Sequence, residues 1–128
     1  MENKDIINTF CILNKTIDKT IEKCKWIQSL NSSTAIYSIK EELKEVIEAL
    51  KKNDDDNLEE EIGDLLFTVV LFGKISEKEG KVNFQKSINR INEKIIKRSP
   101  HVFGDKIANT PKEASDLWNE IKLKDYKN

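Results

Sequence analysis

Residues 58–80, LEEEIGDLLFTVVLFGKISEKEG, carry the pattern that decides the fold. Apolar residues recur there at spacings of three and four, which is the mark of one buried stripe on an α-helix. Gly80 follows the last turn, where glycine commonly ends a helix. The stretch therefore predicts a long helix over residues 58–79. The residues of its buried stripe are Ile62, Leu65, Leu66, Val69, Val70 and Ile75.

The same spacing continues on both sides of this helix. It predicts three further helices, over about residues 5–24, 36–52 and 84–98. The run NDDDN at 53–57 predicts a turn, because short Asn and Asp side chains bond the neighbouring backbone. The sequence TPKE at 110–113 predicts a capping box at the start of a short last helix. With no strand pattern, we expect an all-α fold, an antiparallel bundle of about five helices in a single domain, 1–128. The apolar positions expected to face inward on the second and fourth helices are Ile39, Leu43, Val46, Ile47, Leu50, Ile88, Ile91, Ile95 and Ile96.

Charge and composition exclude several classes of protein. The chain has 22 basic and 23 acidic residues among 128, a formal net charge of −1, without the basic excess typical of nucleic-acid binders. Its longest apolar run, 65–72, is far shorter than the ~20 residues that span a bilayer. Cys11 and Cys24 make no disulfide framework, and the N-terminal segment lacks the apolar core of a signal peptide. We therefore expect a soluble, cytoplasmic protein with no nucleic-acid or membrane partner.

Carboxylates gather on the two helices that flank the NDDDN turn. Glu61 and Asp64 lie three residues apart and so share a face beside the apolar stripe. An antiparallel hairpin with its turn centred on residue 53 brings Glu45 level with Glu61, and the same register brings Glu42 level with Asp64. Carboxylates at one level repel unless a divalent cation lies between them, and Mg²⁺ prefers such oxygen ligands. From spacing alone, a merely solvated acidic face is the competing interpretation.

A second set of charged residues lies on the predicted helix over 84–98. Lys94 and Arg98 are four residues apart and therefore share a face. Such cations suit a polyphosphate, to which arginine can donate two parallel hydrogen bonds. Two ordinary surface cations are the alternative that these residues alone leave open. Trp118, on the last helix, is typical of a core residue.

Taken together, these segments resemble the MazG family of nucleoside triphosphate pyrophosphohydrolases. The family pattern E-E-x-x-E followed by E-x-x-D is matched by EELKE at 41–45 and EIGD at 61–64. The blocks EEIGDLLFTVVLF, NEKIIKRSPHVFGD and LWNEIKLKD, and the EG pair at 79–80, are similar to family segments in order and spacing. CKWI at 24–27 resembles the family's C-P-W-D. The resemblance extends over about residues 10–125.

The resemblance implies an all-α enzyme that hydrolyses NTPs or dNTPs to the monophosphate and pyrophosphate, cleaning the nucleotide pool. It implies Mg²⁺ as the cofactor, with Mn²⁺ as a substitute, and a homodimer whose helices complete a four-helix core, with a tetramer left open. Glu41 matches an acid beside the metal that orients or deprotonates water. Lys94 and Arg98 match triphosphate contacts, and Trp118 matches a position near the nucleotide. The positions that match the family's metal ligands are Glu42, Glu45, Glu61 and Asp64.

Departures from the family pattern fall around the substrate pocket. Ile27 stands where the family has an Asp, Ser99 where it often has a His, and Asn57 where some members have a basic residue. They leave the base preference open, so a narrow-specificity pyrophosphohydrolase acting on dUTP, dCTP or phosphoribosyl-ATP is one alternative. A non-catalytic, regulatory helical dimer that binds nucleotides or a protein partner is the other.

Overall fold

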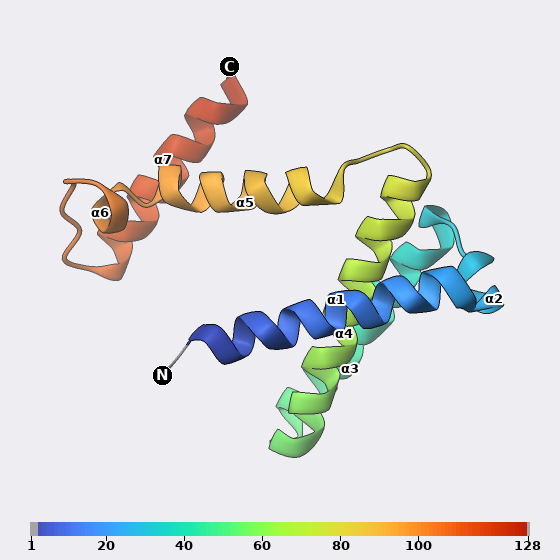
Figure 1. Cartoon of the computed structure of the whole chain (residues 1–128). Helices are drawn as coiled ribbons and strands as arrows, with labels where there is room; N and C mark the ends of the chain where they lie inside the picture. The colour runs from blue at the N-terminus through green and yellow to red at the C-terminus, as the bar shows by residue number, and fades with distance from the viewer. Residues whose placement is uncertain (1–2, 128) are drawn as a thin grey trace. The chain divides into compact units, whose positions relative to one another are not determined.

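The structure, a computed structural model, describes residues 3–127, and within them it consists of seven helices without a strand (Figure 1). The chain divides into two compact units, Met1–Val82 and Asn83–Asn128. In the described residues no helix has the length and apolar character needed to cross a membrane. The helices are α1 (Asn3–Lys23), α2 (Lys25–Gln28), α3 (Ser32–Lys51), α4 (Asp55–Lys78), α5 (Phe84–Arg98), α6 (Pro100–Phe103) and α7 (Pro111–Lys127).

The expected all-α class is confirmed, and the five long helices are the four that the apolar spacing predicts and the last one, predicted from the capping box. The sequence pattern missed α2 and α6, which have four residues each, because one turn is too short to show a periodicity. The predicted helix starts were late, since α3 begins at Ser32 and α4 at Asp55. In both cases polar residues assigned to loops lie in the first turn, where free N–H groups favour them. The last helix, predicted to be short, extends to Lys127.

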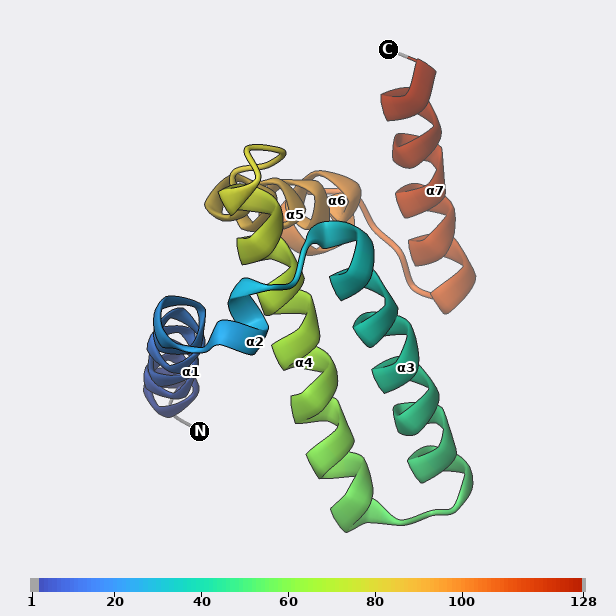
Figure 2. The same ribbon diagram turned by 90° about the vertical axis from the view of Figure 1, so that its right-hand side faces the viewer.

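Helices α3 and α4 form an antiparallel hairpin in the first unit (Figure 2). The Asn31 side chain caps α3 by accepting from the Thr34 N–H at 3.0 Å, and the Asp54 side chain caps α4 by accepting from the Asn57 N–H at 3.1 Å. Between the helices, Asn53 has a φ of 55°, in the left-handed region that Asn tolerates better than most residues. Most of the NDDDN run is therefore helix and cap, and the turn itself is tight enough to fix the register of the hairpin.

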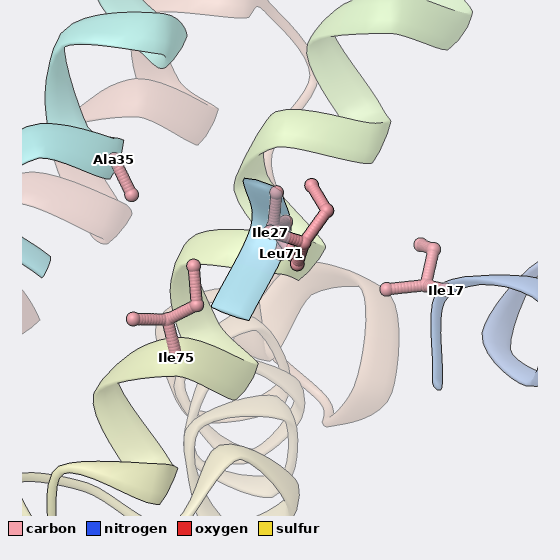
Figure 3. Packing of buried hydrophobic residues seen from close by; sticks show 5 residues of the cluster. All are labelled: Ile17, Ile27, Ala35, Leu71 and Ile75. Atoms are coloured by element: carbon pink, nitrogen blue, oxygen red, sulfur yellow. The ribbon is translucent and has the colours of Figure 1, made fainter. Parts of the chain in front are cut away.

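The core of the first unit joins α1, α2, α3 and α4 (Figure 3). Ile27, at the position of the family's Asp, belongs to this core and is buried. An ion pair of 2.6 Å between Lys74 of α4 and Asp18 of α1 adds a polar link. Cys11 is exposed and Cys24 is half-buried, and both are free thiols. The buried residues of the core are Ile17, Ile27, Ala35, Leu71 and Ile75.

Most of the apolar positions predicted to face inward on α3 and α5, and Ile62 and Val69 of the α4 stripe, are exposed in the single chain, so that prediction was wrong for an isolated molecule. Ile39 and Val46 of α3 are half-buried. On α3 the buried apolar residues are instead Ala35 and Ala49. Within the second unit only α6 and α7 are available to cover α5. A monomer that exposes contiguous apolar stripes commonly uses them for association. The exposed members are Leu43, Ile47 and Leu50 on α3 and Ile88, Ile91, Ile95 and Ile96 on α5.

The second unit contains α5, α6 and α7. The Asn83 side chain caps α5, and Pro100, at the start of α6, follows its last turn. At the start of α7 the Thr110 hydroxyl accepts from the Glu113 N–H at 3.1 Å, which is one half of the predicted capping box. In the other half, the Glu113 carboxylate accepts from the N–H of Asn109, one residue before the cap, at 3.0 Å. The predicted start of the last helix is thus confirmed, but Glu113 accepts from the residue before the cap and not from the cap itself.

Candidate active site

Three carboxylates meet across the α3–α4 hairpin. Oxygen atoms of Glu42, Glu61 and Asp64 all lie within 4.8 Å of one another. Glu42 comes from α3, and the other two come from successive turns of α4, so the register expected from the turn is present. Glu42 and Glu61 are half-buried and Asp64 is exposed. Oxygens at this separation can surround one divalent cation, which binds its oxygen ligands at about 2.0–2.6 Å.

The electrostatics of this cluster centre on Glu61. Its loss of hydration, and then the negative charges of Asp64 and Glu42, raise the pKa of the Glu61 carboxyl, with Glu45 and Glu60 acting in the same direction. The neighbouring carboxylates thus make a bound positive charge favourable, whether a proton or a metal ion. Because the cluster offers only carboxylate oxygens, its donor chemistry fits Mg²⁺ or Mn²⁺ rather than a softer metal.

Two of the predicted acids lie outside the three-carboxylate cluster. Glu45 is exposed on α3, one turn after Glu42, and acts on Glu61 through its charge. Glu41 is also exposed, and its carboxylate lies 3.4 Å from the Lys44 ammonium group. The suggested roles of Glu45 as a metal ligand and Glu41 as the acid beside the metal stay predictions.

A basic pocket lies within the second unit. It has a volume of about 450 Å³ and is lined by residues of α5 and α7. Both Lys94 and Arg98 line it, as their four-residue spacing predicts. Four cations face two carboxylates, so the pocket has a positive balance that suits an anion. The lining residues are Arg90, Glu93, Lys94, Lys97, Arg98, Asp125 and Tyr126.

Arg98 is held on two sides in this pocket, with 7% of its side chain exposed. The Asp125 carboxylate accepts from its Nε at 3.4 Å and its Nη2 at 3.3 Å, and the guanidinium carbon lies 5.7 Å from the centre of the Trp118 ring. Lys97 donates to the other Asp125 oxygen at 2.6 Å. The hydrogen bonds from Lys97 and then Arg98 lower the pKa of Asp125 below its usual value. The suggested contacts of Lys94, Arg98 and Trp118 with substrate stay predictions.

Sequence patterns missed Asp125 as a partner of the basic residues. One signal could have found it, because Asp125 follows Trp118 by seven residues, two helical turns, and both therefore lie on one face of α7. That this face of α7 packs against the side of α5 that carries Arg98 is visible only in the structure. Arg90 was also missed, although it lies four residues before Lys94 and the same helical spacing could have found it.

Comparison with known proteins identifies the family. Residues 30–103 match the model of the MazG nucleotide pyrophosphohydrolase domain. The chain is 34% identical over 102 residues to the nucleoside triphosphate pyrophosphohydrolase of Escherichia coli K12, covering 80% of this chain and 39% of that protein. It is 35% identical over 104 residues to the nucleoside triphosphate pyrophosphohydrolase/pyrophosphatase MazG of Thermotoga maritima, covering 81% and 39%.

A solved structure is also similar. The crystal structure of a mazG-related protein from Thermotoga maritima superposes with a TM-score of 0.78 at 32% identity, covering 87% of this chain and 96% of that one. The chain spans about two-fifths of the length of the two full-length relatives above. The family match, the sequence identity and the common fold agree, and the chain belongs to the MazG nucleotide pyrophosphohydrolase family.

Proposed function

We propose that the protein hydrolyses nucleoside and deoxynucleoside triphosphates at the α-phosphate, releasing the monophosphate and pyrophosphate, and so cleans the nucleotide pool. The observation that carries this proposal is the cluster of Glu42, Glu61 and Asp64 in a chain of the MazG family. The name of the Escherichia coli relative, nucleoside triphosphate pyrophosphohydrolase, supports the same reaction. In this proposal both units, residues 1–128, act as one functional domain.

The carboxylates of the hairpin are the proposed metal ligands. Glu42, Glu61 and Asp64 would hold Mg²⁺, or Mn²⁺ in its place, and Glu45 would join them from the next turn of α3. A bound divalent cation would neutralise charge on the phosphate oxygens of the substrate. With the cation bound, this acidic surface could accept an anionic substrate.

The remaining residues would handle water and phosphate. Glu41 would orient the attacking water and accept its proton before passing it to solvent. A bond forms between the water oxygen and the α-phosphorus, and the bond from that phosphorus to the bridging oxygen breaks, so that pyrophosphate leaves with the electron pair. Lys94 and Arg98 would bind the phosphates and offset this charge, with Trp118 near the nucleotide.

A homodimer is the proposed assembly, with helices of two copies completing a four-helix core. The support is the pair of exposed apolar stripes, on α3 and on α5. Isoleucines such as Ile47 and Ile91 are 40% and 48% exposed, and covering this remaining surface with a second copy would gain roughly 1 kcal/mol for each side chain.

The test is a product assay over a panel of NTPs and dNTPs, including dUTP and dCTP, with phosphoribosyl-ATP as a further substrate. We expect pyrophosphate and the monophosphate in equal amounts, dependent on Mg²⁺ or Mn²⁺. Release of orthophosphate and the diphosphate would place the cleavage elsewhere and contradict the proposal. The absence of any product over the panel would favour the non-catalytic binding role, and product from one substrate alone would favour a narrow-specificity enzyme.

A further inference from the structure

We propose that Asp125 is a positioning residue, which orients the Arg98 guanidinium so that one of its edges stays free to bind a phosphate group. The inference rests on the proposed function for the identity of the natural substrate. It deepens that proposal by assigning a role in the basic pocket to an acidic residue of α7, although its negative charge repels an anionic ligand.

The hydrogen bonds define which edge of Arg98 is used. Asp125 Oδ2 accepts from Nε and Nη2, at 3.4 and 3.3 Å. These two nitrogens form one side of the planar guanidinium fork. Nη1 donates no hydrogen bond within the part of the chain that the structure describes. The end of the fork formed by Nη1 and the second Nη2 hydrogen is therefore available for a bidentate bond to an anion.

Trp118 restricts the remaining freedom of the same side chain. Its ring centre lies 5.7 Å from the Arg98 guanidinium carbon, close enough for a cation–π contact. Only 7% of the Arg98 side chain is exposed. A guanidinium held along one edge and against a ring has lost most of its rotational freedom before any ligand arrives. Ligand binding then costs less conformational entropy.

The alternative role for Asp125 is an internal competitor that occupies the place of the phosphate. Its two oxygens argue against that role, because each engages a different cation. Oδ2 bonds Arg98, and Oδ1 accepts from Lys97 at 2.6 Å. The ammonium group of Lys97 has three donors and keeps two of them for other partners. Asp125 thus fixes both cations without using up their donors, and the pocket keeps a positive balance of four cations to two carboxylates.

The first experiment measures binding of inorganic tripolyphosphate to the full chain by calorimetry, without divalent metal. We expect Asp125→Asn to weaken the affinity about tenfold, and Asp125→Glu, which keeps the carboxylate, to restore most of it. Asp116→Asn is the matched control. Asp116 also lies on α7 and pairs with a lysine, Lys112, at 2.8 Å, but it does not line the pocket. Its replacement should leave the affinity unchanged.

The second experiment is a double-mutant cycle with Arg98→Gln. If Asp125 acts through Arg98, Asp125→Asn should change the affinity less than about twofold in the Arg98→Gln background. An equal loss in both backgrounds would overturn the proposal. Tighter binding by Asp125→Asn in the wild-type background would also overturn it, by making Asp125 a competitor of the ligand.

Turnover gives a third readout that a purely structural role would not produce. Asp125→Asn should raise KM for the triphosphate while kcat changes less than about twofold, because Asp125 orients a binding group. A fall in kcat with an unchanged KM would contradict this role. The two proposals fail separately: tripolyphosphate binding without pyrophosphate release contradicts the proposed reaction alone. A wild-type chain that does not bind tripolyphosphate overturns the positioning role.

Discussion

Glu79, at the end of α4, binds Ser32, in the first turn of α3, through both of its carboxylate oxygens. Oε2 accepts from the Ser32 N–H at 2.7 Å, and Oε1 accepts from the Ser32 hydroxyl at 2.6 Å. Lys81 donates to the same hydroxyl oxygen at 2.7 Å. A carboxylate is favourable at a helix N-terminus, where backbone N–H groups are unpaired. This contact closes the end of the hairpin opposite Asn53, so the register of the carboxylate cluster is fixed at both ends.

We expect Glu79→Gln to lower the thermal midpoint by a few degrees, because a neutral amide replaces a charged acceptor of two hydrogen bonds. The hydrogen bonds from the Ser32 side chain and backbone lower the pKa of Glu79. A lowered pKa in the folded state gives stability that is present above the usual glutamate pKa of ~4.3 and is lost as pH falls through the folded value. Thermal melts between about pH 3 and 7 should therefore show that the difference in midpoint between Glu79→Gln and wild type becomes smaller in acid.

The control for this prediction is Glu59→Gln, an exposed glutamate near the other end of α4. Its melting curves should follow those of the wild type across the pH range. A constant difference between Glu79→Gln and wild type at every pH would show that the charge of Glu79 has no part in holding the hairpin.

Replacing either Glu42 or Asp64 by Ala should reduce turnover at least about a hundredfold, because each removes a carboxylate from the proposed metal site. Neither side chain is in the core, so circular dichroism should show the same helix content. Glu48→Ala, an exposed glutamate on α3 outside the cluster, should keep wild-type activity. Pyrophosphate release at saturating Mg²⁺ is the measurement. Full activity in both cluster variants would refute the site.

The sequence was sufficient to predict that Glu42, Glu61 and Asp64 meet, because every step is local, whereas Glu45, expected at the same level, lies outside the cluster. Helical periodicity sets the face of each acid, and a short turn at Asn53 sets the register, which together bring Glu42 to Glu61 and Asp64. The contact of Glu79 with Ser32 joins residues 47 positions apart through a helix end, and no periodicity reports on it.

Packing between helices also limited what could be predicted. Asp125 reaches Arg98 only because α7 packs on α5, and a sequence pattern gives the face of each helix without saying which faces meet. The apolar stripes were correctly located along α3 and α5, but their burial depends on how many helices cover them. Ile47 and Ile91 are exposed in the single chain for that reason.

The raised pKa of Glu61 predicts how metal-free stability depends on pH. Its loss of hydration and the charges of Asp64 and Glu42 raise this pKa in the folded state. The folded chain then binds the proton more tightly than the unfolded chain, so stability without metal falls as pH rises through the raised value. Glu61→Gln removes one of the repelling charges and should raise the metal-free melting temperature above that pH. Glu48→Gln, outside the cluster, should leave the pH dependence as in wild type.

Mg²⁺ should reverse this loss of stability. In the proposed site the ion would bind the ionised carboxylates of the folded hairpin, so the melting temperature of wild type should rise with Mg²⁺ concentration, and rise more at neutral pH than in acid. Glu61→Gln should gain less at equal Mg²⁺, because it offers one fewer charged ligand. Melting temperatures of wild type that do not respond to millimolar Mg²⁺ or Mn²⁺ would contradict a metal site in the cluster.

The exposed stripes predict the assembly in solution. The 14.8 kDa chain should sediment at twice its mass, and Ile47→Asp or Ile91→Asp should shift it toward the monomer, because a charge in an apolar interface loses its hydration without compensation. Ile107→Asp is the matched control, since Ile107 is 78% exposed but lies in the segment between α6 and α7, outside both stripes. Sedimentation equilibrium at micromolar concentration distinguishes the cases. A wild-type chain that is monomeric there, with both stripes in water, would rule out the proposed four-helix core.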